Sequence, residues 1–231
     1  MRAELAALLG VALLSGAPAL AQTAATPAPT PAETLDLETM MDYFAKSRGV
    51  EAEYREEKTL PLLAEPIVSE GVLYFVPPDR LARFTRSPER ASTLIDGDRL
   101  RIEDSLGVEE IDLASQEVIR QFIDQLLLLF RGDLAELRRH YEVGFESAGE
   151  SWTLTLTATG FRLRQVIQEI SMRGTAGRLE QMQMKGREGE LTTTAYGRVV
   201  TDRAFESEEV AALFPPEGSP VPISSPDPAT P

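Results

Sequence analysis

The segment from Trp152 to Ala158 alternates strictly between apolar side chains and threonines. Thr153, Thr155 and Thr157 fall on one face of the extended chain, and the apolar residues fall on the other. This period of two is that of a β-strand with one buried face and one wet face. Because strands of parallel sheets are buried on both faces, the pattern predicts an antiparallel sheet with one apolar side.

Similar short segments, separated by turn residues, lie on both sides of this strand. The tripeptide Asp96-Gly97-Asp98 is typical of a hairpin turn, and residues 185–189 form another turn signal. The further predicted strands span residues 51–58, 71–76, 80–85, 92–95, 99–103, 108–113, 166–172, 179–184 and 191–196. We therefore expect a sheet of roughly nine to eleven strands, which should curl because long twisted sheets do not stay flat.

The first predicted helix precedes the strands. Leu37, Met40, Met41 and Phe44 have the spacing of one apolar helix face, and Asp36 is a suitable N-cap. This amphipathic pattern predicts a helix that packs against the apolar side of the sheet.

A second helix is predicted in the middle of the chain, over residues 116–130. Its apolar side chains recur with a period of 3.6, and its last turn, Leu-Leu-Leu-Leu-Phe, is apolar all round. Gly132 should end it, and Asp133 should cap a short helix over residues 134–139. A closing helix is expected at residues 207–213. The mid-chain helix fits two interpretations, an ordinary core helix or a lid whose spare face lines a lipid cavity.

The N-terminus has the features of a secretory signal peptide. Arg2 supplies a positive charge, residues 5–14 form a short apolar core, and Ala19-Leu20-Ala21 is a small-x-small cleavage site. Its apolar run is much shorter than the roughly 20 residues that span a bilayer. We therefore expect export from the cytoplasm and cleavage after Ala21.

Composition sets the boundaries of the remaining chain. Residues 22–33 are a Pro/Ala/Thr linker, residues 34–214 the folded domain, and residues 215–231 a Pro-rich tail.

The 231 residues include no cysteine and carry a net charge of −14. We expect neither disulfides nor a lipid anchor, and the acidic surface makes nucleic acid and anionic membranes unfavourable partners.

No set of catalytic side chains stands out in the sequence. His140 is the one histidine, and we interpret it as a surface or capping residue. The chain has no Gly-rich phosphate loop and no G-x-S-x-G motif. The glutamates of residues 51–57 are interpreted as a solvated strand face. We expect no enzyme activity, no metal and no cofactor; a hydrolase with a site assembled only by the fold is a third alternative.

Several segments resemble one known family. Residues 69–81 match the pattern G-x-L-x-F-x-x-P-x-x-L/F, residues 94–100 resemble its hairpin with the pattern dG-x-x-L, and residues 214–218 match its closing F-P-P-x-G. Residues 49–54 also resemble its first strand. Together, residues 35–218 resemble the periplasmic outer-membrane lipoprotein carriers, the LolA-like family.

The resemblance implies an α+β fold, a strongly curved antiparallel sheet that forms an unclosed half-barrel covered by lid helices. It also implies a soluble, monomeric periplasmic carrier that shields the acyl chains of a lipoprotein or lipid in a hydrophobic cavity. Such a carrier takes its cargo from an inner-membrane exporter and passes it to an outer-membrane acceptor. The alternative is a periplasmic lipid-binding sensor or adaptor of the same fold that regulates an envelope partner.

The resemblance also bears on the cavity and its lid. Carriers of this family place an arginine directly before the proline of the G-x-L segment, where it pins the lid. Pro77 occupies that position here, so we expect a different lid control, with Arg80 as the substitute.

Strand parity and helix phase give the candidate lipid-binding residues, which are Leu73, Phe75, Leu81, Phe122, Leu126, Leu129, Phe130, Leu154, Leu156, Ile170 and Met172.

Overall fold

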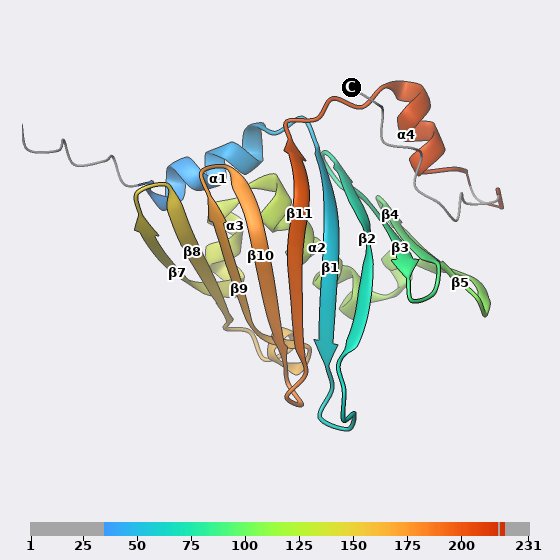
Figure 1. Ribbon diagram of the computed structural model, residues 1–231, viewed down its shortest axis with the longest axis horizontal. Helices are drawn as coiled ribbons and strands as arrows, with labels where there is room; N and C mark the ends of the chain where they lie inside the picture. Colours follow the sequence, from blue (N-terminus) through green and yellow to red (C-terminus); the bar gives the residue numbers. More distant parts are fainter. Residues whose placement is uncertain (1–34, 217, 220–231) are drawn as a thin grey trace, which may run out of the picture. The chain divides into compact units, whose positions relative to one another are not determined.

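The computed structural model describes residues 35–216, 218 and 219. The predicted signal peptide, the linker and most of the Pro-rich tail lie outside the described residues. The described part of the chain forms an 11-stranded antiparallel sheet with helices against it (Figure 1). This arrangement confirms the predicted α+β fold.

The elements follow one another in a simple order along the chain. The strands are β1 (Val50–Thr59), β2 (Ile67–Val76), β3 (Arg80–Ser87), β4 (Ala91–Asp96), β5 (Arg99–Asp104), β6 (Gly107–Asp112), β7 (Tyr141–Ala148), β8 (Ser151–Ala158), β9 (Ile167–Thr175), β10 (Arg178–Gly186) and β11 (Leu191–Thr201). The helices are α1 (Leu37–Lys46), α2 (Glu117–Arg131), α3 (Leu134–His140) and α4 (Ser207–Leu213), with short 3-10 turns η1 (Leu113–Ser115) and η2 (Leu163–Gln165).

The strand order explains where the helices lie. It runs β6-β5-β4-β3-β2-β1-β11-β10-β9-β8-β7, so the first and last strands pair at the centre and β6 and β7 form the edges. The chain must therefore travel from one edge to the other between β6 and β7. It does so through α2 and α3, which cross the apolar side of the sheet (Figure 1). The sheet stays open, as expected for a half-barrel.

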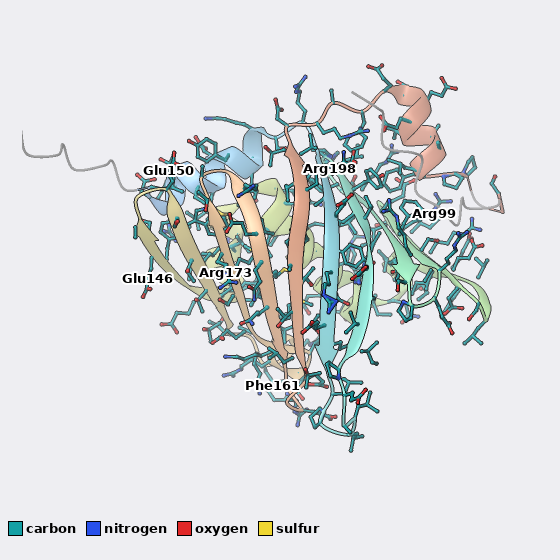
Figure 2. The ribbon with its side chains drawn as sticks, viewed as in Figure 1. Arg99, Glu146, Glu150, Phe161, Arg173 and Arg198 are labelled. Carbon is teal, nitrogen blue, oxygen red and sulfur yellow. The ribbon has the colours of Figure 1, made fainter. Side chains whose placement is uncertain are left out.

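The side of the sheet that faces α1, α2 and α3, here called the inner face, carries two apolar clusters. One joins β7–β10 to α1 and α3, and includes Met40, Trp152 and Leu154. The other joins β1–β5 to α2, and includes Phe75 and Ile123. The outer face is largely wet over β9–β11, where Arg173 and Arg198 project into solvent (Figure 2). Burial of alternate residues is the reason that this sheet has two chemically different faces.

Helix ends follow the capping residues in the sequence. The Asp36 carboxylate accepts a hydrogen bond of 2.7 Å from a first-turn backbone N–H of α1, and Asp133 does the same for α3 at 3.0 Å. Gly132 ends α2 with a φ of 66°, a left-handed conformation that favours glycine. The main chain of α1 also approaches this position so closely that a side chain would collide with it. The three predicted caps are confirmed.

Two differences from the sequence analysis concern the ends of the fold. Strand β7 was not predicted, although Tyr141, Val143 and Phe145 alternate with more polar residues in the pattern of a strand with one buried face. The first residues of the predicted tail pack against β5. Arg99 donates a hydrogen bond of 2.9 Å to the carbonyl of Pro215, and Arg101 donates one of 2.7 Å to that of Ser219.

Candidate functional site

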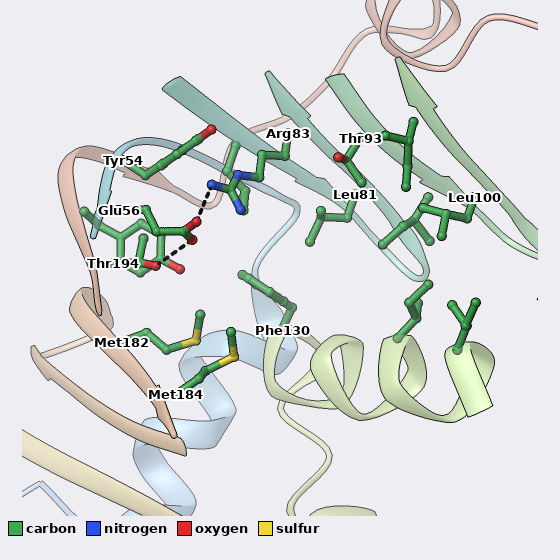
Figure 3. A pocket seen from close by; sticks show the side chains of 16 residues that line it. Tyr54, Glu56, Leu81, Arg83, Thr93, Leu100, Phe130, Met182, Met184 and Thr194 are labelled. Atoms are coloured by element: carbon green, nitrogen blue, oxygen red, sulfur yellow. Dashed lines mark hydrogen bonds and ion pairs between the residues drawn. The ribbon is translucent and has the colours of Figure 1, made fainter. Parts of the chain in front are cut away.

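A cavity of about 310 Å³ lies between the inner face of the sheet and α2 (Figure 3). Its walls come from β1–β5, from β10 and β11, and from one side of the helix. Most of the lining is aliphatic or aromatic, and the apolar part includes Leu73, Leu81, Ile95, Leu100, Ile123 and Phe130. The volume is at the lower end of the roughly 300–1,000 Å³ that is typical of small-molecule sites.

Some predicted lipid-binding residues do meet at this cavity. Leu73, Leu81 and Phe130 line it. Phe75 lies directly behind the wall, where its ring stacks on Phe130 with centroids 5.0 Å apart. The phase of β2 and β3 therefore turns these side chains toward the cavity, and their contact with a lipid stays a prediction.

Five other predicted residues lie in the cluster that α1, α3 and the last turns of α2 form with β7–β10. In this cluster, side chains fill the space between helices and sheet; the five are Leu129, Leu154, Leu156, Ile170 and Met172. Phe122 and Leu126 belong to α2, but their side chains lie outside what the structure describes. For all of these residues, contact with a lipid stays a prediction.

Arg80 projects from the outer face of β3. Its Nε lies 2.7 Å from the Asp96 carboxylate, and its guanidinium lies over the ring of Phe214. Phe214 packs in the cluster that α4 forms on the outer face. These contacts are on the side of the sheet opposite to α2, so lid control by Arg80 stays a prediction without a contact that supports it.

Other arginines connect α2 to the sheet and its loops. Arg131 Nε donates a hydrogen bond of 2.7 Å to the carbonyl of Pro78, in the turn between β2 and β3. Arg120 pairs with Asp98 in the turn between β4 and β5. At the other end, Arg162 reaches Glu117 at 2.8 Å from the segment between β8 and β9. These exposed polar contacts hold α2 over the cavity.

One end of the cavity is polar. Arg83 Nη2 lies 2.9 Å from a carboxylate oxygen of Glu56, and the second oxygen of Glu56 accepts a hydrogen bond of 3.2 Å from Thr194 (Figure 3). The guanidinium also lies over the ring of Tyr54, at 4.3 Å from its centroid. With Tyr196, these side chains form what we call the polar end of the cavity.

Burial sets the protonation states at the polar end. Burial alone would lower the pKa of Arg83, but Glu56 and Tyr54 more than offset this effect, and the pKa rises above its ordinary value. Burial also raises the pKa of Tyr196 well above the usual range, helped by Glu56. The guanidinium is therefore charged and the phenol neutral at all physiological pH values.

The sequence analysis missed the polar end. Glu56 belongs to a run of glutamates that was interpreted as solvated, yet only 17% of its side chain is exposed. Glu51, in the same run, is also buried and pairs with Arg203 at 2.7 Å. The available signal was parity: Arg83 lies two residues after Leu81, so both must project from the same face of β3.

No metal centre emerges among the described residues, where no three histidines or acidic side chains gather around one point. His140 Nε2 lies 3.2 Å from a Glu136 oxygen at the end of α3, on the outside of the helix layer. Nor does any helix in the described part of the chain have the length and apolar character needed to cross a membrane.

An open antiparallel half-barrel with a helix over an apolar cavity defines a class of binding proteins. The sequence profile described as outer membrane lipoprotein carrier protein LolA-like matches residues 28–214. The chain therefore belongs to the LolA-like family, as its motifs indicated. This family is one of periplasmic binding and carrier proteins rather than enzymes. No protein of curated function matches the sequence.

Several solved structures are similar to this one. A chain of the Pseudomonas aeruginosa MucA/MucB complex is 14% identical, with a TM-score of 0.46 over 75% of this chain. The present chain spans 58% of that relative's length. A DUF1329 family protein from Desulfovibrio piger is 12% identical, with a TM-score of 0.42 over 77% of this chain and 96% of its own. A LolA superfamily protein from Nitrosomonas europaea is 13% identical, with a TM-score of 0.39 over 75% and 96%.

Proposed function

We propose that the protein is a periplasmic carrier that shields an acyl chain of a lipoprotein or lipid and moves it from the inner to the outer membrane. The observation that carries this proposal is the apolar cavity between β1–β5 and α2. Each Å² of apolar surface removed from water contributes about 25 cal/mol. An acyl chain held between Leu81, Leu100 and Phe130 would therefore gain several kcal/mol relative to water.

The walls of the cavity favour an adaptable site. Met182 and Met184 line it, and their unbranched thioether side chains adjust to different shapes at low cost. A second space of about 30 Å³ lies next to it and shares Leu73, Phe130 and Tyr196 as lining residues. Rotation of these side chains would join the two spaces and lengthen the site.

The contacts that hold α2 are suited to opening. Exposed ion pairs contribute roughly 0–1 kcal/mol each, so separating Arg162 from Glu117 and Arg120 from Asp98 costs little. In the proposed cycle, an inner-membrane exporter loads the open form and an outer-membrane acceptor empties it. The predicted signal peptide would deliver the protein, as a monomer, to the compartment between them.

Ligand capture and transfer test this proposal together. The full-length protein is purified from its producing organism, and native mass spectrometry is expected to detect a bound lipid. The delipidated protein is expected to take up a fluorescent acyl probe and to release it to vesicles. Absence of both bound lipid and probe uptake would contradict the proposal. Uptake with no release to vesicles, even when envelope extract is added, would favour the sensor or adaptor alternative instead.

A further inference from the structure

The polar end of the cavity carries hydrogen-bonding capacity that the protein itself does not use. Arg83 donates hydrogen bonds from Nη2 to Glu56 at 2.9 Å and to Ser69 at 3.4 Å, and Tyr54 is a further hydrogen-bonding partner of the guanidinium. A guanidinium has five N–H groups, so the three on Nε and Nη1 take no part in these two bonds. Arg83 therefore retains donors beside the cavity that Leu81, from the same strand face, also lines.

Tyr196 supplies a second donor. Its hydroxyl keeps its proton because burial raises the pKa of the phenol. None of the residues that the structure describes accepts a hydrogen bond from it. By contrast, the two oxygens of Glu56 are both engaged, one by Arg83 and the other by Thr194. The unused capacity at the polar end is thus mainly that of donors, which suit an acceptor such as a carbonyl oxygen.

Charge decides which kind of carbonyl fits. The guanidinium of Arg83 is already compensated by Glu56, and the pair is mostly buried, with 29% and 17% of the two side chains exposed. A carboxylate that approached Arg83 would also meet the negative charge of Glu56, where low polarity strengthens the repulsion. A neutral ester or amide carbonyl accepts the same hydrogen bonds and meets no such repulsion.

Resting on the proposed function, we propose that the polar end recognises the carbonyl of a neutral acyl ester or amide and discriminates against free fatty acids. Arg83 is the specificity-determining donor, Tyr196 donates a second hydrogen bond, and Glu56 excludes the anion. The acyl chain then extends from this end along the apolar lining toward Leu100 (Figure 3). A carrier with this arrangement takes esterified or amidated chains and leaves free fatty acids in solution.

Competition between ligands with identical chains tests this assignment. Nile red, a neutral apolar dye, is bound to the delipidated full-length protein and displaced by monododecanoylglycerol, N-dodecanoyl ethanolamine or dodecanoate. The ester and the amide are expected to bind at least tenfold more tightly than the carboxylate, since only the carboxylate meets the repulsion of the Glu56 charge in the cavity. Equal affinities for all three in the native protein would overturn the proposal.

Two variants test the roles of the charges. In Glu56→Gln, Arg83 has no compensating anion, so dodecanoate is expected to gain about tenfold relative to the ester. In the double variant Glu56→Gln/Arg83→Gln, which buries no uncompensated charge, the ester and the carboxylate are expected to bind with similar affinity. The control is Arg55→Gln, because Arg55 pairs with Glu57 and Glu70 on the outer face; its ligand preference should stay native.

The possible failures are distinguishable. If Nile red and all three ligands fail to bind, the proposed carrier function itself is contradicted, and the carbonyl assignment with it. If they bind but Glu56→Gln leaves the ratio of ester to carboxylate affinity unchanged, the carbonyl assignment is wrong while the carrier function stands. Circular dichroism and urea unfolding of each variant show that the comparison concerns folded protein.

Discussion

Arg131, at the C-terminal end of α2, donates a hydrogen bond to the carbonyl of Pro78 in the turn between β2 and β3. The acceptor lies one residue after Pro77, the position at which LolA-like carriers are expected to place their lid arginine. In this chain, α2 is therefore tied to the turn between β2 and β3 by a cation of the helix itself.

Removal of this contact should speed ligand exchange. Since a hydrogen bond contributes about 0.5–1.5 kcal/mol net, Arg131→Ala is expected to raise the release rate of an acyl probe roughly two- to tenfold. Stopped-flow transfer to vesicles measures that rate. The matched control is Arg138→Ala, because Arg138 pairs with Glu38 between α3 and α1 at 3.4 Å and does not hold α2 to the sheet. Equal release rates in all three proteins would show that the Arg131 contact does not control the lid.

Filling the cavity should abolish binding without unfolding the protein. Leu81→Phe places a larger side chain into the space, so probe affinity is expected to fall at least tenfold while stability changes by less than about 1.5 kcal/mol. Leu94→Phe is the control, because Leu94 packs on the outer face of the neighbouring strand. That change is expected to cost about 1–3 kcal/mol through overpacking and to leave probe affinity intact. Unaltered affinity in Leu81→Phe would place the ligand elsewhere.

Tyr141 should destabilise the protein through its hydroxyl. Only 2% of the residue is exposed, and its hydroxyl finds no hydrogen-bonding partner within the described part of the chain. Tyr141→Phe is therefore expected to raise the free energy of unfolding by about 1 kcal/mol, measured by urea denaturation. In Tyr43→Phe, where 49% of the tyrosine is exposed, the change should stay within about 0.5 kcal/mol.

The same tyrosine predicts a loss of stability at alkaline pH. Burial raises the pKa of Tyr141 from 10.0 to about 12 in the folded protein. Between these values the unfolded chain releases the proton and the folded protein retains it. The free energy of unfolding is therefore independent of this group below about pH 10 and decreases as the pH rises to 12. The total loss is about 2–3 kcal/mol, at roughly 1.4 kcal/mol for each pH unit. Tyr141→Phe should lose less stability across this window than the native protein, and an identical loss in both would refute the assignment.

Gly71 marks a close approach between strands. A side chain there would collide with the backbone of Phe84 on β3 and would lie 2.8 Å from the Tyr54 hydroxyl. Gly71→Ala is expected to cost roughly 2–4 kcal/mol in urea denaturation. Gly144→Ala on β7 is the matched control, since the nearest atoms would be 3.8 Å away and the change should be within about 0.5 kcal/mol. A small effect at Gly71 would mean that β2 and β3 separate easily.

The alternation of side chains was sufficient to predict the sheet. Its period of two follows from the geometry of a strand and does not depend on which element covers the buried face. It could not locate the cavity. Leu81 and Leu154 both project from the inner face, but α1 and α3 fill the space over Leu154, whereas α2 leaves space over Leu81. That difference depends on the path of α2 between the two sheet edges, which no local pattern encodes.

The polar end was missed for a related reason. Glu56 and Thr194 are 138 residues apart and become neighbours only because β1 pairs with β11. In a single sequence, Glu56 is one acidic residue in a charged strand, and Arg83 is one of many arginines. Parity with Leu81 would have placed Arg83 on the inner face, but the role of an inward charge can be inferred only when its counter-ion is known.

The pairing of β1 with β11 also constrains how the molecule folds. Contacts between the first and last strands have the largest loop-closure cost, so the seam between them should form late and slowly. The two flanking meanders, β1–β6 and β7–β11, involve mostly neighbouring strands and can form earlier. Glu56 belongs to β1 and Thr194 to β11, so a nascent or C-terminally truncated chain would lack a complete polar end of the cavity. Binding of the ligand would then require that β1 and β11 have already paired.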